Sequence, residues 1–131
     1  MLAALLVGSG AHPLATSDLG AIEGELMFPS CSELPADLQV CAEDPATGAR
    51  TCTQRFVAQD GYRYRLDLPS GRYAVYAETA SKRPGYRAYY SAAVRCGLTV
   101  ACTDHKPLAV EVERAKTSAE ISPADWFANR R

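Results

Sequence analysis

Residues 60–77 have the sequence DGYRYRLDLPSGRYAVYA, and this stretch decides the fold class. Apolar and polar side chains alternate on both sides of a Pro-Ser-Gly step, as they do in strands that bury one face. The apolar set is Tyr62, Tyr64, Leu66 and Leu68 before the step, and Tyr73, Val75 and Ala77 after it. Pro69 fixes its own φ, and Gly71 adopts turn conformations that other residues resist. We therefore predict two strands joined by a tight turn, a hairpin at the centre of a small β-sandwich.

Short alternating segments continue on both sides of this hairpin and are separated by turn residues. We expect further strands at 21–28, 38–42, 51–58, 86–94 and 108–113, and a short last pairing at 117–121. In the first of these strands, the inward side chains would be Ile22, Leu26 and Phe28. After the last one, Ser122 would cap a helical turn that packs Trp126 and Phe127 against the sandwich. The pattern predicts an all-β sandwich of about seven strands with a short C-terminal helical turn.

Size and charge restrict the class of protein. With 131 residues the chain is long enough for one domain with its own core, and we assign residues 16–131 to it. The formal net charge is −1, and charged residues of both signs are interspersed. A chain without a basic field has no general attraction to nucleic acid or to anionic membranes. We expect no nucleic-acid partner.

The N-terminal residues 1–15 resemble the second half of a secretory signal peptide. An apolar run at 2–7 is followed by small residues, which offer cleavage after Ala11 or Ala15. The positively charged start of such a peptide is missing, and the run is too short to span a bilayer. We predict a partial signal peptide or disordered leader, no transmembrane segment, and a periplasmic or secreted protein.

Five cysteines agree with export, because disulfides persist in oxidising compartments. Cys41 and Cys52 flank a turn sequence, and folding that turn as a hairpin would place them nearly opposite each other. Cys96 and Cys102 flank a short loop that a local disulfide would close. Cys31 is then left over, and spacing alone leaves other pairings open. Because no pair has CxxC spacing, we expect neither a zinc site nor a cofactor.

Parts of the chain resemble a known family. Ile22-Glu23-Gly24 at the opening of a strand, the segment 60–75 and a closing Val110-Glu111-Val112 are similar to the carboxypeptidase regulatory-like domain. The resemblance spans about residues 19–123 and implies a transthyretin-like β-sandwich. Members of that superfamily are mostly non-catalytic accessory, adhesion or binding modules. The cysteines, the segment 86–90 and the ending Asp125-Trp126-Phe127 depart from the family pattern, as does Arg114-Ala115 where the family often has glycine.

Enzymes and self-crosslinking domains on related sandwiches need residues that this sequence lacks. Hydroxyisourate hydrolases and intradiol dioxygenases use several histidines, whereas this chain has His12 in the leader and His105. Pilin-type domains form an isopeptide bond between a first-strand lysine and an asparagine, but the asparagine here is Asn129, near the C-terminus. We therefore expect no enzyme.

His105 supports the main alternative, a small envelope metal-binding protein or enzyme. With Asp104 and Cys102 it could bind copper or form an acid–base pair, although a turn position between a disulfide and a strand needs no such role. A triad of Ser91, His105 and Asp104 lacks a nucleophile-elbow sequence. A second alternative is an inhibitor of an envelope hydrolase that presents the loop 81–85.

The strand at 86–94 carries the binding prediction. By alternation Tyr86 and Tyr90 face one way, while Arg87 and Tyr89 face the other. Tyrosine and arginine suit contacts with proteins and glycans, and Tyr76 of the preceding strand could join them on an exposed sheet face. Tyr86, Arg87, Tyr89 and Tyr76 are therefore the expected binding residues. The predicted function is a non-enzymatic binding or structural module of the bacterial envelope, with a protein or glycan partner.

Overall fold

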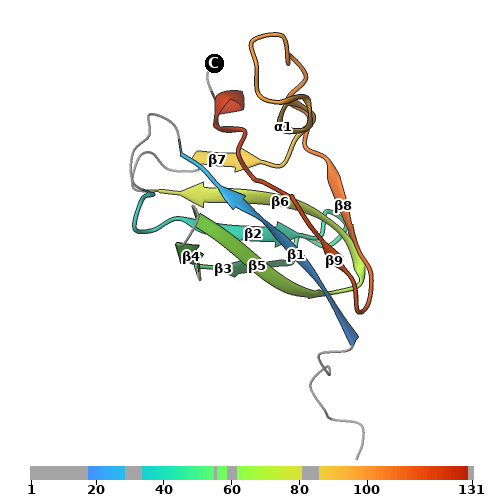
Figure 1. Ribbon diagram of the computed structural model, residues 1–131. Coiled ribbons are helices and arrows are strands. Elements are labelled where there is room, and N and C mark those ends of the chain that lie inside the picture. Colours follow the sequence, from blue (N-terminus) through green and yellow to red (C-terminus); the bar gives the residue numbers. More distant parts are fainter. Residues whose placement is uncertain (1–17, 29–33, 55, 59–61, 81–85, 130–131) are drawn as a thin grey trace, which may run out of the picture.

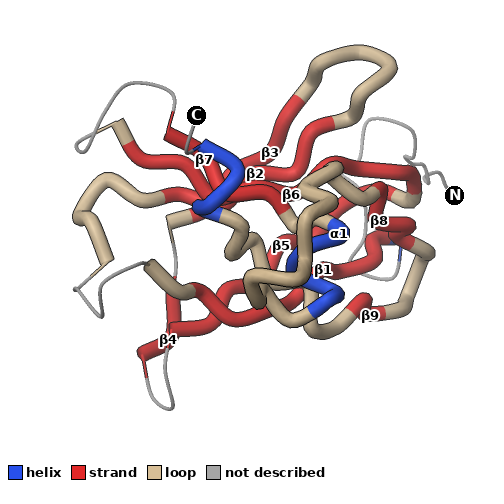
Figure 2. The backbone as a smooth tube through the Cα atoms, turned by 90° about the horizontal axis from the view of Figure 1, so that it is seen from above, coloured by secondary structure: helices blue, strands red, loops and turns tan. Residues whose placement is uncertain are grey.

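The protein folds as an all-β sandwich of two sheets. The computed structural model describes residues 18–28, 34–54, 56–58, 62–80 and 86–129. The strands are β1 (Leu19–Leu26), β2 (Gln39–Glu43), β3 (Arg50–Thr53), β4 (Phe56–Ala58), β5 (Tyr62–Pro69), β6 (Gly71–Thr79), β7 (Tyr86–Tyr89), β8 (Ala109–Val112) and β9 (Thr117–Ser118). The β1 sheet has the order β4-β5-β1-β9, and the β6 sheet has the order β3-β2-β6-β7, with β8 also paired to β6. Figure 2 shows the two sheets as two layers.

The core fills the space between the layers. The β1 sheet contributes Ile22 and Leu66, and the β6 sheet contributes Val40, Val75 and Val112, all of them buried. Along β5 and β8 the buried positions alternate with exposed residues, as a sheet with one solvated face requires, whereas Cys41 of β2 and Tyr76 of β6 are buried on the outer face as well. The predicted fold class and the inward faces of these strands are confirmed.

Residues 62–77 lie in two strands, β5 and β6, but these strands are not a hairpin. β5 pairs with β1, where Leu66 lies opposite Ile22. β6 pairs with β2, where Val75 lies opposite Ala42. The turn at Ser70 therefore carries the chain from one sheet to the other, and the predicted pairing of the two arms is wrong. Side-chain alternation could not distinguish a hairpin within one sheet from two strands in different sheets, because in both arrangements the apolar faces point into the same core.

The predicted strand at 51–58 is two strands. It breaks at Gln54, so that β3 belongs to the β6 sheet and β4 to the β1 sheet. A single regular strand with Cys52 opposite Cys41 would have turned Phe56 outward. With the break, Cys52 lies opposite Cys41 while Phe56 pairs with Tyr64 and packs against the core. The change of sheet thus satisfies both the disulfide and the core.

The strand expected at 86–94 ends at Tyr89, and its last residues form a helix. Ser91 caps α1 (Ala92–Cys96) by accepting a hydrogen bond from the amide of Val94, and Gly97 ends it with a φ of 111°. Beyond Val75, the edge of β6 is occupied by β8. The chain after β7 must therefore leave the sheet, and the segment 90–108 loops out between β7 and β8.

The C-terminal segment packs differently from its prediction. Ser122 does not cap a helix, because its hydroxyl accepts a hydrogen bond from the amide of Glu25. The helical turn is the 3-10 helix η4 (Trp126–Asn129), at the same end of the sandwich as α1 (Figure 1). Trp126 is 1% exposed and donates through Nε1 to the carbonyl of Met27, as a core residue should. Phe127 is 39% exposed and is thus less buried than Trp126.

Candidate functional site

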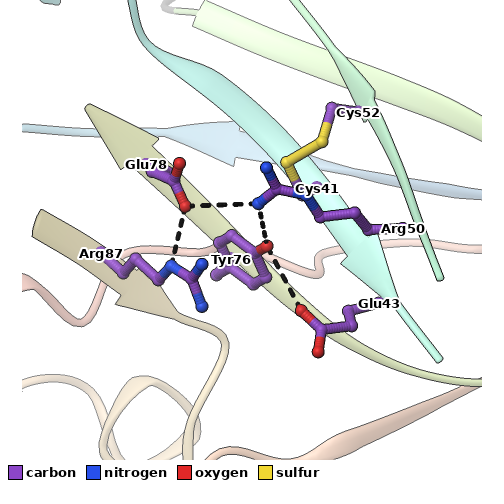
Figure 3. Close-up of a disulfide and its surroundings, with 7 residues drawn as sticks. All are labelled: Cys41, Glu43, Arg50, Cys52, Tyr76, Glu78 and Arg87. Carbon is purple, nitrogen blue, oxygen red and sulfur yellow. Dashed lines mark hydrogen bonds and ion pairs between the residues drawn. A yellow bond between two sulfur atoms is a disulfide. The ribbon is translucent and has the colours of Figure 1, made fainter. Parts of the chain in front are cut away.

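Two groups of side chains are candidates for function, and the first covers the outer face of the β6 sheet. We call it the outer-face cluster: Arg50 from β3, Tyr76 and Glu78 from β6, and Arg87 and Tyr89 from β7 (Figure 3). Strand register makes the cluster, because Tyr76 lies opposite Tyr89 and Glu78 opposite Arg87. Side chains two residues apart on a strand share a face, so all five residues of neighbouring strands point the same way.

Tyr76 forms the floor of the cluster. Its side chain is fully buried, with the Arg87 guanidinium carbon 4.2 Å from the ring centre and the Tyr89 ring 5.2 Å away. Its hydroxyl accepts a hydrogen bond of 2.8 Å from Arg50 and donates one of 3.4 Å to Glu43. The expectation that Tyr76 lies on an exposed face is therefore wrong. Long arginine side chains lie over the ring and take its place at the surface.

The charges of the cluster are paired within it. Glu78 lies 2.7 Å from Arg87 Nε and 3.6 Å from Arg50, and Arg87 also donates to the Tyr89 hydroxyl at 3.2 Å. The hydrogen bond to Tyr76 raises the pKa of Arg50, so this guanidinium stays charged at every relevant pH. The side chains of Arg50 and Arg87 are 41% and 34% exposed. The cluster has two arginines and one glutamate, and the adjacent carboxylate of Glu43, 3.4 Å from the Tyr76 hydroxyl, balances the charge of this half-exposed surface.

Three of the four predicted binding residues meet on this face. Tyr86 lies on the other side of β7, where its ring packs 4.7 Å from Trp126 and 6.3 Å from Phe28. The alternation separated Tyr86 from Arg87 and Tyr89 correctly. Arg50 was not among the predicted binding residues. Its strand β3 is separated from β6 by β2, and this strand order could not be read from the sequence.

Both predicted disulfides are confirmed. Cys41–Cys52 joins β2 to β3, with Cys41 directly opposite Tyr76 of β6. Cys96–Cys102 closes the loop after α1. Cys31, the leader 1–15 and the loop 81–85 lie outside the described residues.

The second candidate is a buried carboxylate. Asp125 is 1% exposed, and its Oδ2 accepts a hydrogen bond of 2.6 Å from the hydroxyl of Ser91. The same oxygen lies 2.7 Å from Nδ1 of His105, whose side chain is 30% exposed. Within the described part of the chain, Oδ1 of Asp125 has no hydrogen-bond partner. We call Ser91, His105 and Asp125 the Asp125 cluster.

The Asp125 cluster differs from the one considered from sequence. Asp104 is not the partner of His105, because its carboxylate accepts from the backbone amide of Lys106. Ser91 is fully buried and donates to Asp125 rather than to the imidazole, so it is not placed as a nucleophile. Three residues so far apart along the chain leave no motif. The one available signal was an aspartate set among apolar residues, Pro-Ala-Asp-Trp-Phe, which indicates a buried carboxylate.

His105 also lines a cavity of about 340 Å³. The other lining residues are Leu98, Thr99, Val100, Cys102 and Phe127. We call this the His105 cavity. An ionised carboxylate only accepts hydrogen bonds, so Asp125 holds the proton of the neutral imidazole on Nδ1. Nε2 is then a hydrogen-bond acceptor, and no described residue bonds to it.

In the described ranges, no three His, Cys, Asp or Glu side chains come close enough together to hold a metal ion. None of the described helices has the length and apolarity that crossing a membrane requires. Comparison with protein-family models, curated proteins and solved structures gave no match to this chain.

Proposed function

We propose that this protein is an exported, non-enzymatic β-sandwich module that binds a protein or an envelope glycan of the bacterial envelope through the outer-face cluster. The observation that carries the proposal is the arrangement of Arg87. Its guanidinium lies over the Tyr76 ring and beside the Tyr89 hydroxyl on a half-exposed sheet face. Arginine and tyrosine together are the residue types that contribute most at protein contacts, and an aromatic ring suits a sugar face.

The pairing inside the cluster supports binding rather than catalysis. Each charged group already has a partner, and the one carboxylate among the five side chains, Glu78, is paired with both Arg87 and Arg50. Side chains that are held in place before contact lose little conformational entropy when a partner arrives. Balanced charge also favours an uncharged or mixed surface over a polyanion. The cluster thus has the properties of a preorganised contact surface.

The Cys41–Cys52 disulfide supports both the site and export. It joins β2 to β3 next to Tyr76, and so fixes the strand that carries Arg50 (Figure 3). Two disulfides in a chain of this size are typical of proteins that fold in an oxidising compartment. The signal-peptide-like leader favours the same compartment.

The test compares two double substitutions of the same chemical kind on different sheets. Arg87→Gln with Tyr89→Ala changes the outer-face cluster, whereas Arg65→Gln with Tyr62→Ala changes two exposed side chains of β5 in the β1 sheet. Immobilised mature proteins are exposed to envelope extract and, separately, to purified cell-wall sacculi. We expect the Arg87/Tyr89 variant to capture at least tenfold less partner than the wild-type protein, and the Arg65/Tyr62 variant to capture as much as the wild-type protein. Capture from the extract would identify a protein partner, and capture of sacculi would identify a glycan partner.

Stability is the internal control. Arg87 forms a partly exposed ion pair worth less than about 1 kcal/mol, and Tyr89→Ala also removes a ring that packs 5.2 Å from Tyr76. The Tm of both double variants is therefore measured, and capture is compared well below the lower of the two transitions. Equal capture by the wild-type protein and the Arg87/Tyr89 variant, with both folded, would remove the outer-face cluster as the binding surface.

A further inference from the structure

We infer that the His105 cavity binds a small uncharged aromatic alcohol, a phenol of one or two rings, whose hydroxyl donates to Nε2 of His105. This site is separate from the outer-face cluster, and it does not rest on the proposed function. Its volume of about 340 Å³ falls at the lower end of the range for small-molecule sites. The inference depends on three features: the fixed imidazole, the uncharged wall and the exposed apolar rim.

The imidazole is fixed by a buried group. Asp125 is 1% exposed and bonds to Nδ1 of His105, which sets the ring orientation and places the proton of the neutral form on Nδ1. Ser91 donates to the same carboxylate oxygen and holds Asp125 in turn. A surface histidine needs no such support. In the neutral form of His105, Nε2 lies on the ring edge away from Asp125 and accepts a hydrogen bond, and this residue lines the cavity.

The remaining wall determines which ligand class fits. Leu98, Val100 and Phe127 are apolar, and Thr99 adds a hydroxyl that lies 3.3 Å from the Cys102 sulfur. The described lining residues include no arginine, lysine, aspartate or glutamate. A neutral ring with one hydrogen-bond donor matches one acceptor among apolar side chains.

The rim of the cavity exposes apolar surface. Among the described residues, the exposed large hydrophobic side chains are Met27, Tyr62, Val100 and Phe127, and two of these border the His105 cavity. Val100 is 99% exposed at the tip of the loop that Cys96–Cys102 closes. Exposed apolar surface beside a cavity is typical of a binding site, because a ligand buries it.

The experiment uses two ligands that differ in the donor. 2-Naphthol carries a hydroxyl, and 2-methoxynaphthalene has the same rings without a donor. Each is titrated into the full chain labelled with ¹⁵N, and the imidazole nitrogens of His105 are followed by long-range ¹H–¹⁵N spectra in a His12→Gln background. We expect saturable binding, a preference of about fivefold for 2-naphthol, as one neutral hydrogen bond gives, and a larger shift at Nε2 than at Nδ1.

Variants separate the hydrogen bond from the cavity. His105→Phe keeps a ring and removes the acceptor, so both ligands should bind equally. Val100→Ser alters an exposed position that folding does not need, and it should weaken both ligands by the same factor. Tyr62→Ser changes an exposed apolar residue of the other sheet and should change neither affinity.

Three results would overturn the inference: no saturable binding of either ligand, equal affinity of the wild-type protein for both, or unchanged affinity in Val100→Ser. If His105→Phe does not fold, the ¹⁵N shift of Nε2 in the wild-type protein and the affinities of Val100→Ser still test the inference.

Discussion

Replacing Tyr64 by phenylalanine tests how the C-terminal segment is held to the sandwich. Tyr64 of β5 is 3% exposed, and its hydroxyl donates to the backbone carbonyl of Ile121. Removing the hydroxyl leaves that buried carbonyl without this donor, which costs about 1–3 kcal/mol. Ile121 is followed by the residues that lead to Asp125, so the bond anchors the segment on which the Asp125 cluster depends.

Tyr73→Phe is the matched control. Tyr73 also donates to a backbone carbonyl, that of Pro69 at 2.8 Å, but this bond is exposed to water. Water replaces a lost donor at such a site, so we expect a loss below about 0.5 kcal/mol. The difference between the two variants isolates the cost of burial. For a domain of this size each kcal/mol of that difference corresponds to about 3–6 °C in Tm.

The dependence of stability on alkaline pH gives a second test of the burial of the Tyr64 hydroxyl. Burial raises the pKa of Tyr64 far above its usual value, whereas an unfolded tyrosine ionises near pH 10. Above that pH the unfolded state has released a proton that the native state keeps, so the free energy of unfolding of the wild-type protein falls as pH rises. The phenylalanine variant lacks this effect. The stability difference between the two proteins should therefore shrink by about 1.4 kcal/mol between pH 9 and pH 11.

Urea unfolding followed by tryptophan fluorescence measures both effects. Trp126 is the single tryptophan of the chain and is 1% exposed, so its emission reports exposure on unfolding. The alkaline series uses a Cys31→Ser background to keep a fifth cysteine from exchanging with the disulfides. Equal losses in the Tyr64 and Tyr73 variants, or a stability difference that does not change with pH, would refute the reasoning.

Three further changes test other parts of the fold. Gly24→Ala should lower the free energy of unfolding by about 1–3 kcal/mol, because a Cβ there would lie 2.1 Å from the Ile121 carbonyl oxygen; urea unfolding within 0.5 kcal/mol of wild type would contradict that contact. Cys96→Ser with Cys102→Ser should cost about 2 kcal/mol by the loop-entropy relation for a separation of 6 residues, measured in the same way. Ser91→Ala removes the α1 cap and a hydrogen bond to a buried carboxylate, so it should cost about 2 kcal/mol; an unchanged calorimetric Tm would show that neither bond matters.

The strands and their inward faces were accessible from the sequence, because a period of two is a local property. Ile22, Leu66 and Val75 are buried as the alternation predicts. Strand partners are not local. β5 and β6 adjoin in the chain yet lie in different sheets, and the same change of sheet divides the segment 51–58. Both errors concern which sheet a strand enters, and side-chain alternation carries no information on that choice.

Site residues that lie close together in the sequence could be predicted, whereas contacts between distant segments could not. Arg87 and Tyr89 share a face by alternation, and the structure places them together. The burial of Tyr76 could not be deduced, since its cover comes from arginines of two other strands. Asp125 was expected at a helix start. Its contacts with Ser91 and His105 depend on the path of the segment 90–108, which no local pattern describes.

That path explains how one small domain can hold two independent surfaces. β7 and β8 occupy successive parts of the same edge of β6, so the chain between them leaves the sheet and returns without altering its pairing. The segment that loops out is closed internally by Cys96–Cys102. Its base is tied to the C-terminal segment by Asp125, which contacts both Ser91 and His105. The outer-face cluster, by contrast, is fixed by strand register and by a disulfide between two strands. The two surfaces share no side chain and are stabilised by different disulfides, and they meet in the backbone, where the amide of Asp125 donates to the carbonyl of Tyr89 at 3.3 Å. A side-chain substitution in one surface that keeps this backbone bond should therefore leave the other surface unchanged.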